Sequence, residues 1–302
     1  MFKDKFLSET DKGEFAIIGK SIIAGLFPIF ATISFLSLPI FFSLLYTYLI
    51  SLIFFALIIT FKKHWHQILI KQVLIESFYV TIFIGFGYYA LYYYGLKHTS
   101  PGNASIIVLL EILFSYIFFN IWKKEHLSKR HLLGASFMII GALILLFPKN
   151  LKVNVGDLFI LLATICVPLG NFYQQKIRKI ASSEIILFLR TFFAIPFILL
   201  LIWHLESATN FSIKPVLIFL IFNGVLHFGL TKILWIEGIH RMSITKATAL
   251  NSITPFFTLI FSYFILNQNP TEWQILSLLP ITLGIYLLTK KQKNIIQEPA
   301  ST

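Results

Sequence analysis

Glu111 is the residue best placed to do chemistry, because it is the only acidic or basic side chain in the apolar run from Pro101 to Trp122. If that run crosses a membrane as a helix, Glu111 lies roughly 15 Å from its end at about 1.5 Å per residue. A short carboxylate cannot reach water from that depth, and a charge at the bilayer centre costs about 2.5–3.5 kcal/mol. Glu111 is therefore either a cavity carboxylate that binds a cationic substrate group or carries a coupling proton, or a structural carboxylate that is neutral or paired to a cation.

A second pair of polar side chains, Asn223 and His227, is one helical turn apart and therefore lies on one face of a helix. Histidine titrates close to neutral pH, so this pair suits a proton-coupled step. The alternative is an interhelical hydrogen bond, which contributes about 0.6–2 kcal/mol in membranes. The sequence leaves both interpretations open.

The elements that hold these residues are apolar helices. The chain of 302 residues is 57% hydrophobic and only 13% charged, whereas a soluble domain holds roughly a quarter charged residues. The run from Pro39 to Phe61 has Tyr46 and Tyr48 as its only ionisable side chains, and it is long enough to cross a hydrocarbon core of about 30 Å. Lipid offers no partner for backbone N–H and C=O groups, so such a run must be helical.

Ten such spans are expected in an all-α integral membrane protein. We place them near residues 15–37, 39–61, 73–95, 101–122, 131–148, 156–175, 184–204, 213–235, 243–266 and 273–289. With a cytoplasmic N-terminus, the inside segments hold 17 Lys and Arg residues and the outside loops hold four. This bias predicts that both termini are cytoplasmic. It also accounts for the net charge of +12, so we expect the lipid bilayer as a partner and no nucleic acid.

The chain contains an internal repeat at an offset of 143 residues. Residues in register include Gly95 with Gly238, Ser100 with Ser243, and Gly141 with Gly284. Each half, residues 1–150 and residues 151–302, then holds five spans, and this odd number turns the second half upside down in the membrane. Inverted repeats are typical of secondary transporters, whose binding sites lie near the bilayer midplane between the halves.

Two stretches follow a common pattern of an aromatic-rich helix, a small-residue turn, a further helix, a short polar connector and a glycine-containing last helix. They are Tyr88-Tyr89-Ala90-Leu91 through Phe147, and Phe228 through Leu288. Together with Asn251-Ser252-Ile253-Thr254-Pro255 and with Glu125 after the fourth span, they resemble the drug/metabolite transporter superfamily, specifically its ten-helix EamA-type permeases. The resemblance implies transport of amino acids or similar amphipathic metabolites.

The repeat also predicts where a binding site lies. The stripe Ala104, Val108, Glu111 and Ser115 matches Ala247, Asn251, Thr254 and Thr258, and the stripe Thr81, Gly85, Tyr88 and Tyr92 matches Gly224, Phe228, Thr231 and Trp235. Each stripe occupies one helix face, so a pseudo-two-fold relation predicts that the four converge on one aromatic-walled cavity. The alternative for the aromatic residues is packing or an interfacial belt. The predicted substrate contacts are Glu111, Tyr88, Tyr92, Asn171, Asn223, His227, Thr231, Trp235, Asn251 and Thr254.

Two prolines inside spans predict bends, because proline frees a backbone carbonyl and kinks a helix. Pro168, followed by Gly170 and Asn171, predicts an interruption of the sixth span, and Pro28 predicts one in the first. Such bends serve either as gating hinges or as purely structural kinks.

Six further charged residues lie within about two turns of a predicted cytoplasmic helix end, where long side chains reach the interface. They are Lys20, Arg190, Lys232, Lys246, Glu76 and Glu237. We expect them to be interfacial anchors, with Arg190, the deepest, as the exception.

These features favour a secondary transporter that exports or exchanges a small amphipathic organic metabolite by alternating access, driven by a proton or solute gradient. The sequence has no G-x-x-x-x-G-K-[ST] run, and we expect no enzymatic activity, cofactor or metal site. The alternatives are an uptake carrier for a nucleotide-like or S-adenosylmethionine-like metabolite, and a membrane sensor or scaffold without transport. The excess of Lys over Arg and the many Ile and Phe residues favour a bacterial protein of the cytoplasmic membrane.

Overall fold

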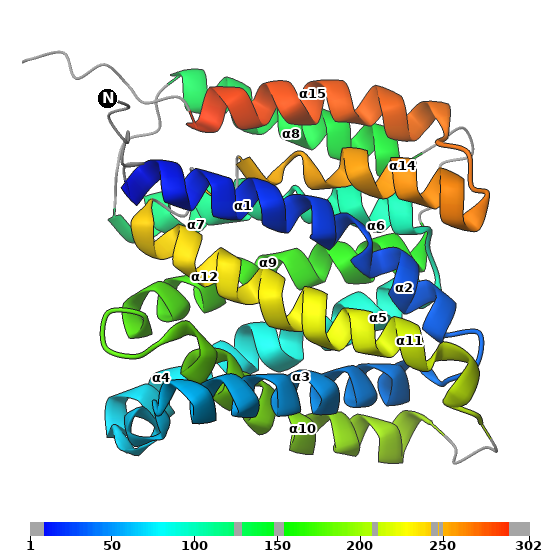
Figure 1. Cartoon of the computed structure of the whole chain (residues 1–302). Helices are drawn as coiled ribbons and strands as arrows, with labels where there is room; N and C mark the ends of the chain where they lie inside the picture. Colours follow the sequence, from blue (N-terminus) through cyan, green and yellow to red (C-terminus); the bar gives the residue numbers. More distant parts are fainter. Residues whose placement is uncertain are drawn as a thin grey trace, which may run out of the picture.

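The computed structural model describes residues 9–123, 129–147, 154–206, 211–242, 247 and 250–289, and every regular element within them is helical (Figure 1). The first half contains α1 (Glu9–Gly25), α2 (Phe27–Ser34), α3 (Ile40–Lys62), η1 (Trp65–Leu69), α4 (Lys71–Val80), η2 (Thr81–Tyr88), α5 (Tyr89–Lys97), α6 (Pro101–Val108), α7 (Glu111–Lys123) and α8 (Lys129–Leu146). The second contains α9 (Val155–Ile177), α10 (Ser183–Leu205), η3 (Lys214–Val216), α11 (Leu217–Ile221), η4 (Phe222–Leu230), α12 (Thr231–Arg241), α14 (Thr254–Leu266) and α15 (Glu272–Thr289).

Seven helices of the described chain are long and apolar enough to cross a membrane. They are Lys12–Ser34, Ile40–Lys62, Lys71–Lys97, Pro101–Phe118, Val155–Ile177, Ser183–Leu205 and Lys214–Arg241. Three shorter apolar helices, Leu132–Leu146, Thr254–Leu266 and Glu272–Leu288, follow the same composition. The all-helical prediction is thus confirmed, whereas the number of ten spans and their orientation stay predictions.

The 143-residue offset reappears in the helix bounds. The helix over Lys12–Ser34 returns as Val155–Ile177 and α3 returns as α10, each shifted by 143 residues. At the other end of each half, α8 returns as α15 with the same shift. The repeat therefore extends over whole helices and not only over the small residues that first indicate it.

Equivalent helices of the two halves pack against each other in antiparallel pairs. At one edge of the bundle, α8 and α15 lie side by side (Figure 1), with Gly134 against Gly284 and Gly141 against Ser277. Gly134 and Ser277 occupy equivalent positions in the two halves, as do Gly141 and Gly284. The 143-residue offset therefore converts each of the two contacts into the other. This reciprocity is what a two-fold relation between the halves produces.

The same relation holds at the opposite edge of the bundle, where α3 packs on α10 (Figure 1). The end of α3 meets the start of α10 through a 3.3 Å ion pair between Lys62 Nζ and Glu184 Oε1. At the other end, the backbone N–H groups of Phe41 and Phe42 donate to the Glu206 carboxylate at 2.8 and 3.2 Å. Equivalent helices that run antiparallel are what an inverted repeat requires, and the division into residues 1–150 and 151–302 remains the prediction built on it.

Both halves depart from regular α-helix at matching places. The π-helical segments η2 and η4 lie at nearly equivalent positions. The fourth span, expected as one helix, breaks in a turn at Leu109 and Leu110, so Glu111 begins α7, and the equivalent turn at Ser252 and Ile253 precedes α14. Proline does not explain both breaks, because the position equivalent to Pro255 is Ile112. Non-helical backbone at membrane depth is tolerated where it faces protein or a cavity.

The two proline predictions have different outcomes. The first span bends as expected, because α1 ends at Gly25 and α2 begins at Phe27, next to Pro28. The predicted interruption of the sixth span is wrong, since α9 runs unbroken from Val155 to Ile177 through Pro168. Gly170 instead provides a close contact with η2, because a Cβ there would lie 2.2 Å from Ile84 Cγ1.

We predict that Gly284→Ala destabilises the fold. A Cβ at this position would lie 2.6 Å from the carbonyl oxygen of Gly134 and 2.5 Å from Met138 Cγ, and the backbone atom cannot move without separating α8 from α15. Overpacking of this kind costs about 1–3 kcal/mol, which thermal unfolding in detergent measures as a lower midpoint. Gly19→Ala is the matched control, because a Cβ on Gly19 meets nothing within 4 Å. Equal midpoints for the two variants would contradict the prediction.

Candidate functional site

A cavity lies at the centre of the bundle, where both halves contribute residues. Its volume is about 100 Å³, counted as the space open to the centres of water-sized molecules. One water molecule needs about 10–15 Å³ on this measure, so the cavity is large enough for several. Its lining comes from α1, α2, η2, α5, α6, α7, α9, α10, η4, α12 and α14. It is lined by Lys20, Phe27, Tyr88, Tyr89, Tyr92, Ser105, Glu111, Asn171, Gln174, Arg190, His227, Lys232, Trp235, Asn251, Thr254 and Thr258, with several apolar side chains.

The structure brings together eight of the ten predicted contact residues. Glu111, Tyr88, Tyr92, Asn171, His227, Trp235, Asn251 and Thr254 line the cavity. The other two, Asn223 and Thr231, are buried outside it. Thr231 donates its hydroxyl hydrogen to the carbonyl oxygen of His227 in the preceding turn of its own helix. Asn223 lies within the π-helical η4, whose winding differs from that of the regular α-helix on which the sequence-based prediction rests.

Glu111 reaches the cavity because the fourth span breaks just before it. Its carboxylate starts α7 and is 8% exposed. The positive end of a helix dipole, at its N-terminus, favours negative charge. The basic residues whose charges act on it are Lys20 and Lys232, from α1 and α12. The carboxylate thus lies among cations of two other helices, which keeps both sequence interpretations open.

Lys20 is not an interfacial anchor, and the sequence-based prediction for it is wrong. Its side chain is 6% exposed and turns into the cavity. The ammonium Nζ donates to Asn251 Oδ1 at 2.6 Å and lies 4.9 Å from the centre of the Trp235 ring. The prediction fails because it used the distance to the helix end, whereas burial depends on the direction in which the helix face points.

The side-chain oxygen Oδ1 of Asn251 accepts hydrogen bonds from residues of both halves. It accepts from Lys20 Nζ, from Ser21 Oγ at 3.1 Å and from Thr254 Oγ1 at 2.9 Å. Three donors on one oxygen hold α1 against the break that precedes α14. The helix break of the second half, at Ser252 and Ile253, is therefore hydrogen-bonded through Asn251 to Lys20 of the first half.

Arg190 and Lys232 form a second group of cations, both on the cavity wall. The Arg190 guanidinium lies 5.9 Å and the Lys232 ammonium 5.7 Å from the centre of the same ring, Tyr89. Arg190 is 1% exposed, and its Nε and Nη2 have no hydrogen-bond partner among the described residues. The anchor prediction is therefore wrong for Lys232, while Arg190 is the exception that was expected.

The aromatic side of the cavity is a stack of rings. Phe27 lies parallel to His227, with centroids 3.7 Å apart, and close to parallel to Tyr92 at 5.3 Å. Tyr92 in turn stacks on Tyr88 at 5.5 Å. Neither ring nitrogen of His227 has a hydrogen-bond partner in the described part of the chain. The aromatic stripe with Tyr88 and Tyr92 and the segment around Pro28 therefore lie on the same wall of the cavity.

Asn171 and Trp235 join the two helices that continue from the cavity toward one end of the bundle. The Trp235 indole Nε1 donates to Asn171 Oδ1 at 3.0 Å, which also accepts from Gln174 Nε2 at 3.3 Å. One turn further, Gln175 Nε2 donates to the carbonyl oxygen of Ile239 at 2.8 Å. These bonds fasten α9 to α12 beside the cavity.

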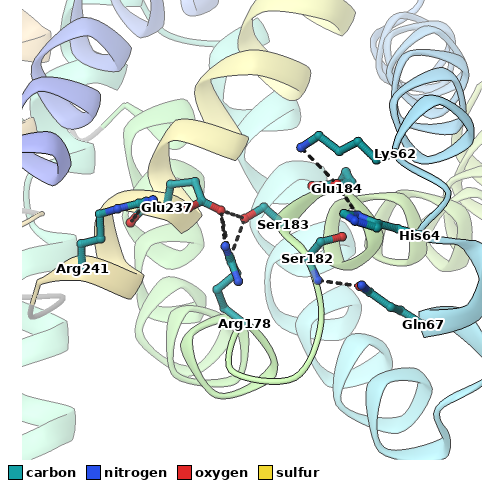
Figure 2. Close-up of polar contacts among 9 residues, drawn as sticks. All are labelled: Lys62, His64, Gln67, Arg178, Ser182, Ser183, Glu184, Glu237 and Arg241. Carbon is teal, nitrogen blue, oxygen red and sulfur yellow. Dashed lines mark hydrogen bonds and ion pairs between the residues drawn. The ribbon is translucent and has the colours of Figure 1, made fainter. Parts of the chain in front are cut away.

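A polar network lies at this end of the bundle (Figure 2). The Glu237 carboxylate accepts from Arg178 at 2.8 Å, from Arg241 at 2.5 Å and from Ser183 Oγ at 2.5 Å. Beside it, Glu184 pairs with Lys62 at 3.3 Å and with His64 Nδ1 at 2.9 Å, and the backbone N–H of Ser182 donates to Gln67 Oε1 at 2.8 Å.

Two residues predicted as anchors take part in ion pairs at this end. Glu237 belongs to the network, and Glu76 pairs with Lys176 at 2.6 Å. Glu76 is buried, so it is held by its partner rather than by interfacial water. The remaining anchor, Lys246, and the family-like Glu125 lie outside the described residues.

The apolar helices and the central cavity with charged side chains on its wall define the class of this molecule as a multi-pass helical membrane protein with a cavity between two related halves. Residues 11–147 and 154–290 both match the EamA-like transporter family. The chain belongs to the EamA-like transporter family, as the resemblance of its motifs predicts.

Individual relatives agree with this assignment. The chain is 27% identical over 222 residues to the uncharacterized transporter YyaM of Bacillus subtilis (strain 168), covering 69% of this chain and 71% of the relative. It is 24% identical over 215 residues to an uncharacterized transporter of Archaeoglobus fulgidus, covering 68% and 72%. One solved crystal structure superposes with a TM-score of 0.67 at 16% identity over 93% of this chain and 96% of that one, which shows a shared fold.

We predict that the cavity is reachable from water. In a Cys166→Ala background, which removes the single natural thiol, Ser105→Cys places a thiol on the cavity wall. Membrane-impermeant thiosulfonates should modify it. Thr47→Cys is the control, because Thr47 is fully buried in α3 and does not line the cavity. Modification of this thiol requires local opening of the protein, so its rate should be lower by about tenfold or more. Equal rates for the two thiols, measured by mass spectrometry, would contradict an accessible cavity.

Proposed function

We propose that the protein is a secondary transporter that moves a small amphipathic organic metabolite, an amino acid or a similar compound, through the central cavity. The observation that carries this proposal is the cavity itself, built from both halves at the two helix breaks and lined by stacked aromatic rings and a few charged groups. Broken helices that present their ends to a central site are typical of secondary transporters. The relatives named as transporters support the same function.

The proposed mechanism is alternating access, in which the two halves rock about the cavity and open it to one side at a time. Polar contacts join the halves at both ends of the bundle. At one end are the Lys62–Glu184 and Glu76–Lys176 pairs. At the other, Asn103 Nδ2 donates to the Asp157 carboxylate at 3.2 Å and Asn103 Oδ1 accepts from Gln274 at 2.8 Å. Breaking one set while the other persists would open one entrance, and a proton or solute gradient would supply the energy for an exporter or exchanger.

We predict that Glu111→Gln slows transport strongly while the fold is retained. The variant keeps the size of the side chain but removes the only carboxylate among the described residues of the cavity wall. Glutamine can neither neutralise a positive charge nor carry a proton as Glu111 can. Removal of a positioned acid or base costs about 10²–10⁴-fold in other systems. The measurement is flux of a candidate metabolite, chosen from the metabolite profile of cells with and without the protein, in proteoliposomes.

Glu272→Gln is the matched control, because Glu272 also lies in the first turn of a helix but is exposed and outside the cavity. Normal flux in both Glu111→Gln and His227→Ala would contradict the proposed site. Metabolite binding without flux in the unaltered protein would favour a sensor over a transporter.

A second prediction concerns the network around Glu237. Glu237→Gln leaves the Arg178 and Arg241 guanidinium groups facing each other without the carboxylate between them. If the network closes this end, its loss should raise the modification rate of Ser105→Cys by about tenfold, which corresponds to about 1.4 kcal/mol in the opening equilibrium. The rate is measured by mass spectrometry with reagent on both sides of the membrane, and Glu272→Gln serves as the control. An unchanged rate would show that this network does not gate the cavity.

A further inference from the structure

We propose that the cavity binds an organic anion, whose carboxylate or phosphate group is held by Arg190, with Lys20 and Lys232 adding to the positive field. This inference rests on the proposed transport function and specifies its substrate class. It differs from the expectation that Glu111 recognises a cationic group, because the cations outnumber the carboxylate on the cavity wall.

The first argument is the state of Arg190. A guanidinium stays charged in proteins, and this one is 1% exposed with Nε and Nη2 unpartnered among the described residues. These two nitrogens form one edge of the guanidinium plane, and their parallel N–H groups match the two oxygens of a carboxylate or phosphate. A buried charge without a partner is strongly destabilising, so a bound anion compensates a cost that the protein alone leaves uncompensated.

The second argument is the charge balance of the wall. Among the described residues that line the cavity, Lys20, Arg190 and Lys232 are basic, whereas Glu111 is the one acidic residue. Glu111 can balance one of the three cations. Arg190 and Lys232 both lie within 6 Å of the centre of the Tyr89 ring, and the Arg190 charge acts on Lys232. Positive charges that interact repel each other, and a nearby anion offsets this repulsion.

The third argument concerns the rest of the ligand. Lys20 already donates to Asn251 at 2.6 Å and faces Trp235. Its main contribution to ligand binding is therefore its positive charge and not a hydrogen bond. The stacked rings of Phe27, Tyr88 and Tyr92 offer an apolar wall for the body of the substrate. Glu111 remains available for an ammonium or hydroxyl group on the same molecule. The expected substrate is thus a small amphipathic metabolite with at least one anionic group.

The test uses matched pairs of compounds in which only the anion differs. One arm compares carboxylate metabolites with their primary amides, and the other compares phosphate monoesters with their parent alcohols. Flux and binding are measured for the full-length protein in proteoliposomes. The anionic member of one pair should be preferred by about tenfold or more, since a site built for a polar group rejects analogues without it. The arm that gives this preference identifies the anion as carboxylate or phosphate.

Arg190→Gln should abolish the preference by raising KM for the anion at least about tenfold, and Arg190→Lys should restore it in part, because lysine keeps the charge but not the paired donors. Arg130→Gln, on α8 and away from the cavity wall, is the control and should behave as the unaltered protein. Equal use of charged and uncharged members, or an unchanged KM in Arg190→Gln, would overturn the inference.

A second readout does not depend on Arg190 variants folding. Ser105→Cys in the Cys166→Ala background is modified by a sulfonate-bearing and by a trimethylammonium-bearing thiosulfonate, each rate being normalised to that of a free thiol in solution. The inference expects faster modification by the anionic reagent, and faster modification by the cationic reagent would overturn it. Transport of uncharged compounds with no effect at Arg190 would refute the anion site but keep the transporter. Anion binding without any flux would refute the transporter but keep the anion site.

Discussion

The cost of placing charge in a low-dielectric interior is the constraint on which the rest of the structure depends. Lipid cannot solvate an ammonium, a guanidinium or a carboxylate, so charged side chains within the spans must turn inward and share one polar space. Lys20, Glu111, Arg190 and Lys232 do so on four different helical segments. The breaks before Glu111 and Thr254 lie at the same cavity, inside the protein, where irregular backbone is tolerated.

The two-fold relation supplies the scaffold for this arrangement. The reciprocal glycine contacts of α8 and α15 hold one edge of the bundle, and the antiparallel pair of α3 and α10 holds the other. The remaining helices lie between these two edges (Figure 1). Small residues permit the close backbone approaches, because dispersion contacts rather than water exclusion drive helix association in lipid. In the proposed alternating-access mechanism, the polar contacts at the two ends of the bundle are the ones that break in turn.

Much of this architecture follows from the sequence, because hydrophobic length predicts the helices and the 143-residue register predicts which faces converge. Glu111 and Tyr88 are found for that reason. Lys20 and Lys232 are missed, since their inward direction depends on contacts such as Lys20 with Asn251, 231 residues away. No proline lies beside the break at Leu109, so the sequence does not predict it. Asn223 lies in the π-helical η4, whose winding is not part of a prediction based on a regular α-helix.

The register has a further consequence for the charged residues of the cavity. Their counterparts 143 positions away are uncharged: Ala163 for Lys20, Thr254 for Glu111, Thr47 for Arg190 and Tyr89 for Lys232. If the halves were identical, the inward-open and outward-open states of the proposed transport cycle would be related by the two-fold axis and would have equal free energies. The four unmatched charges remove that equality. The proposed cycle therefore has one favoured resting state, and the charged side chains of the cavity contribute to that preference.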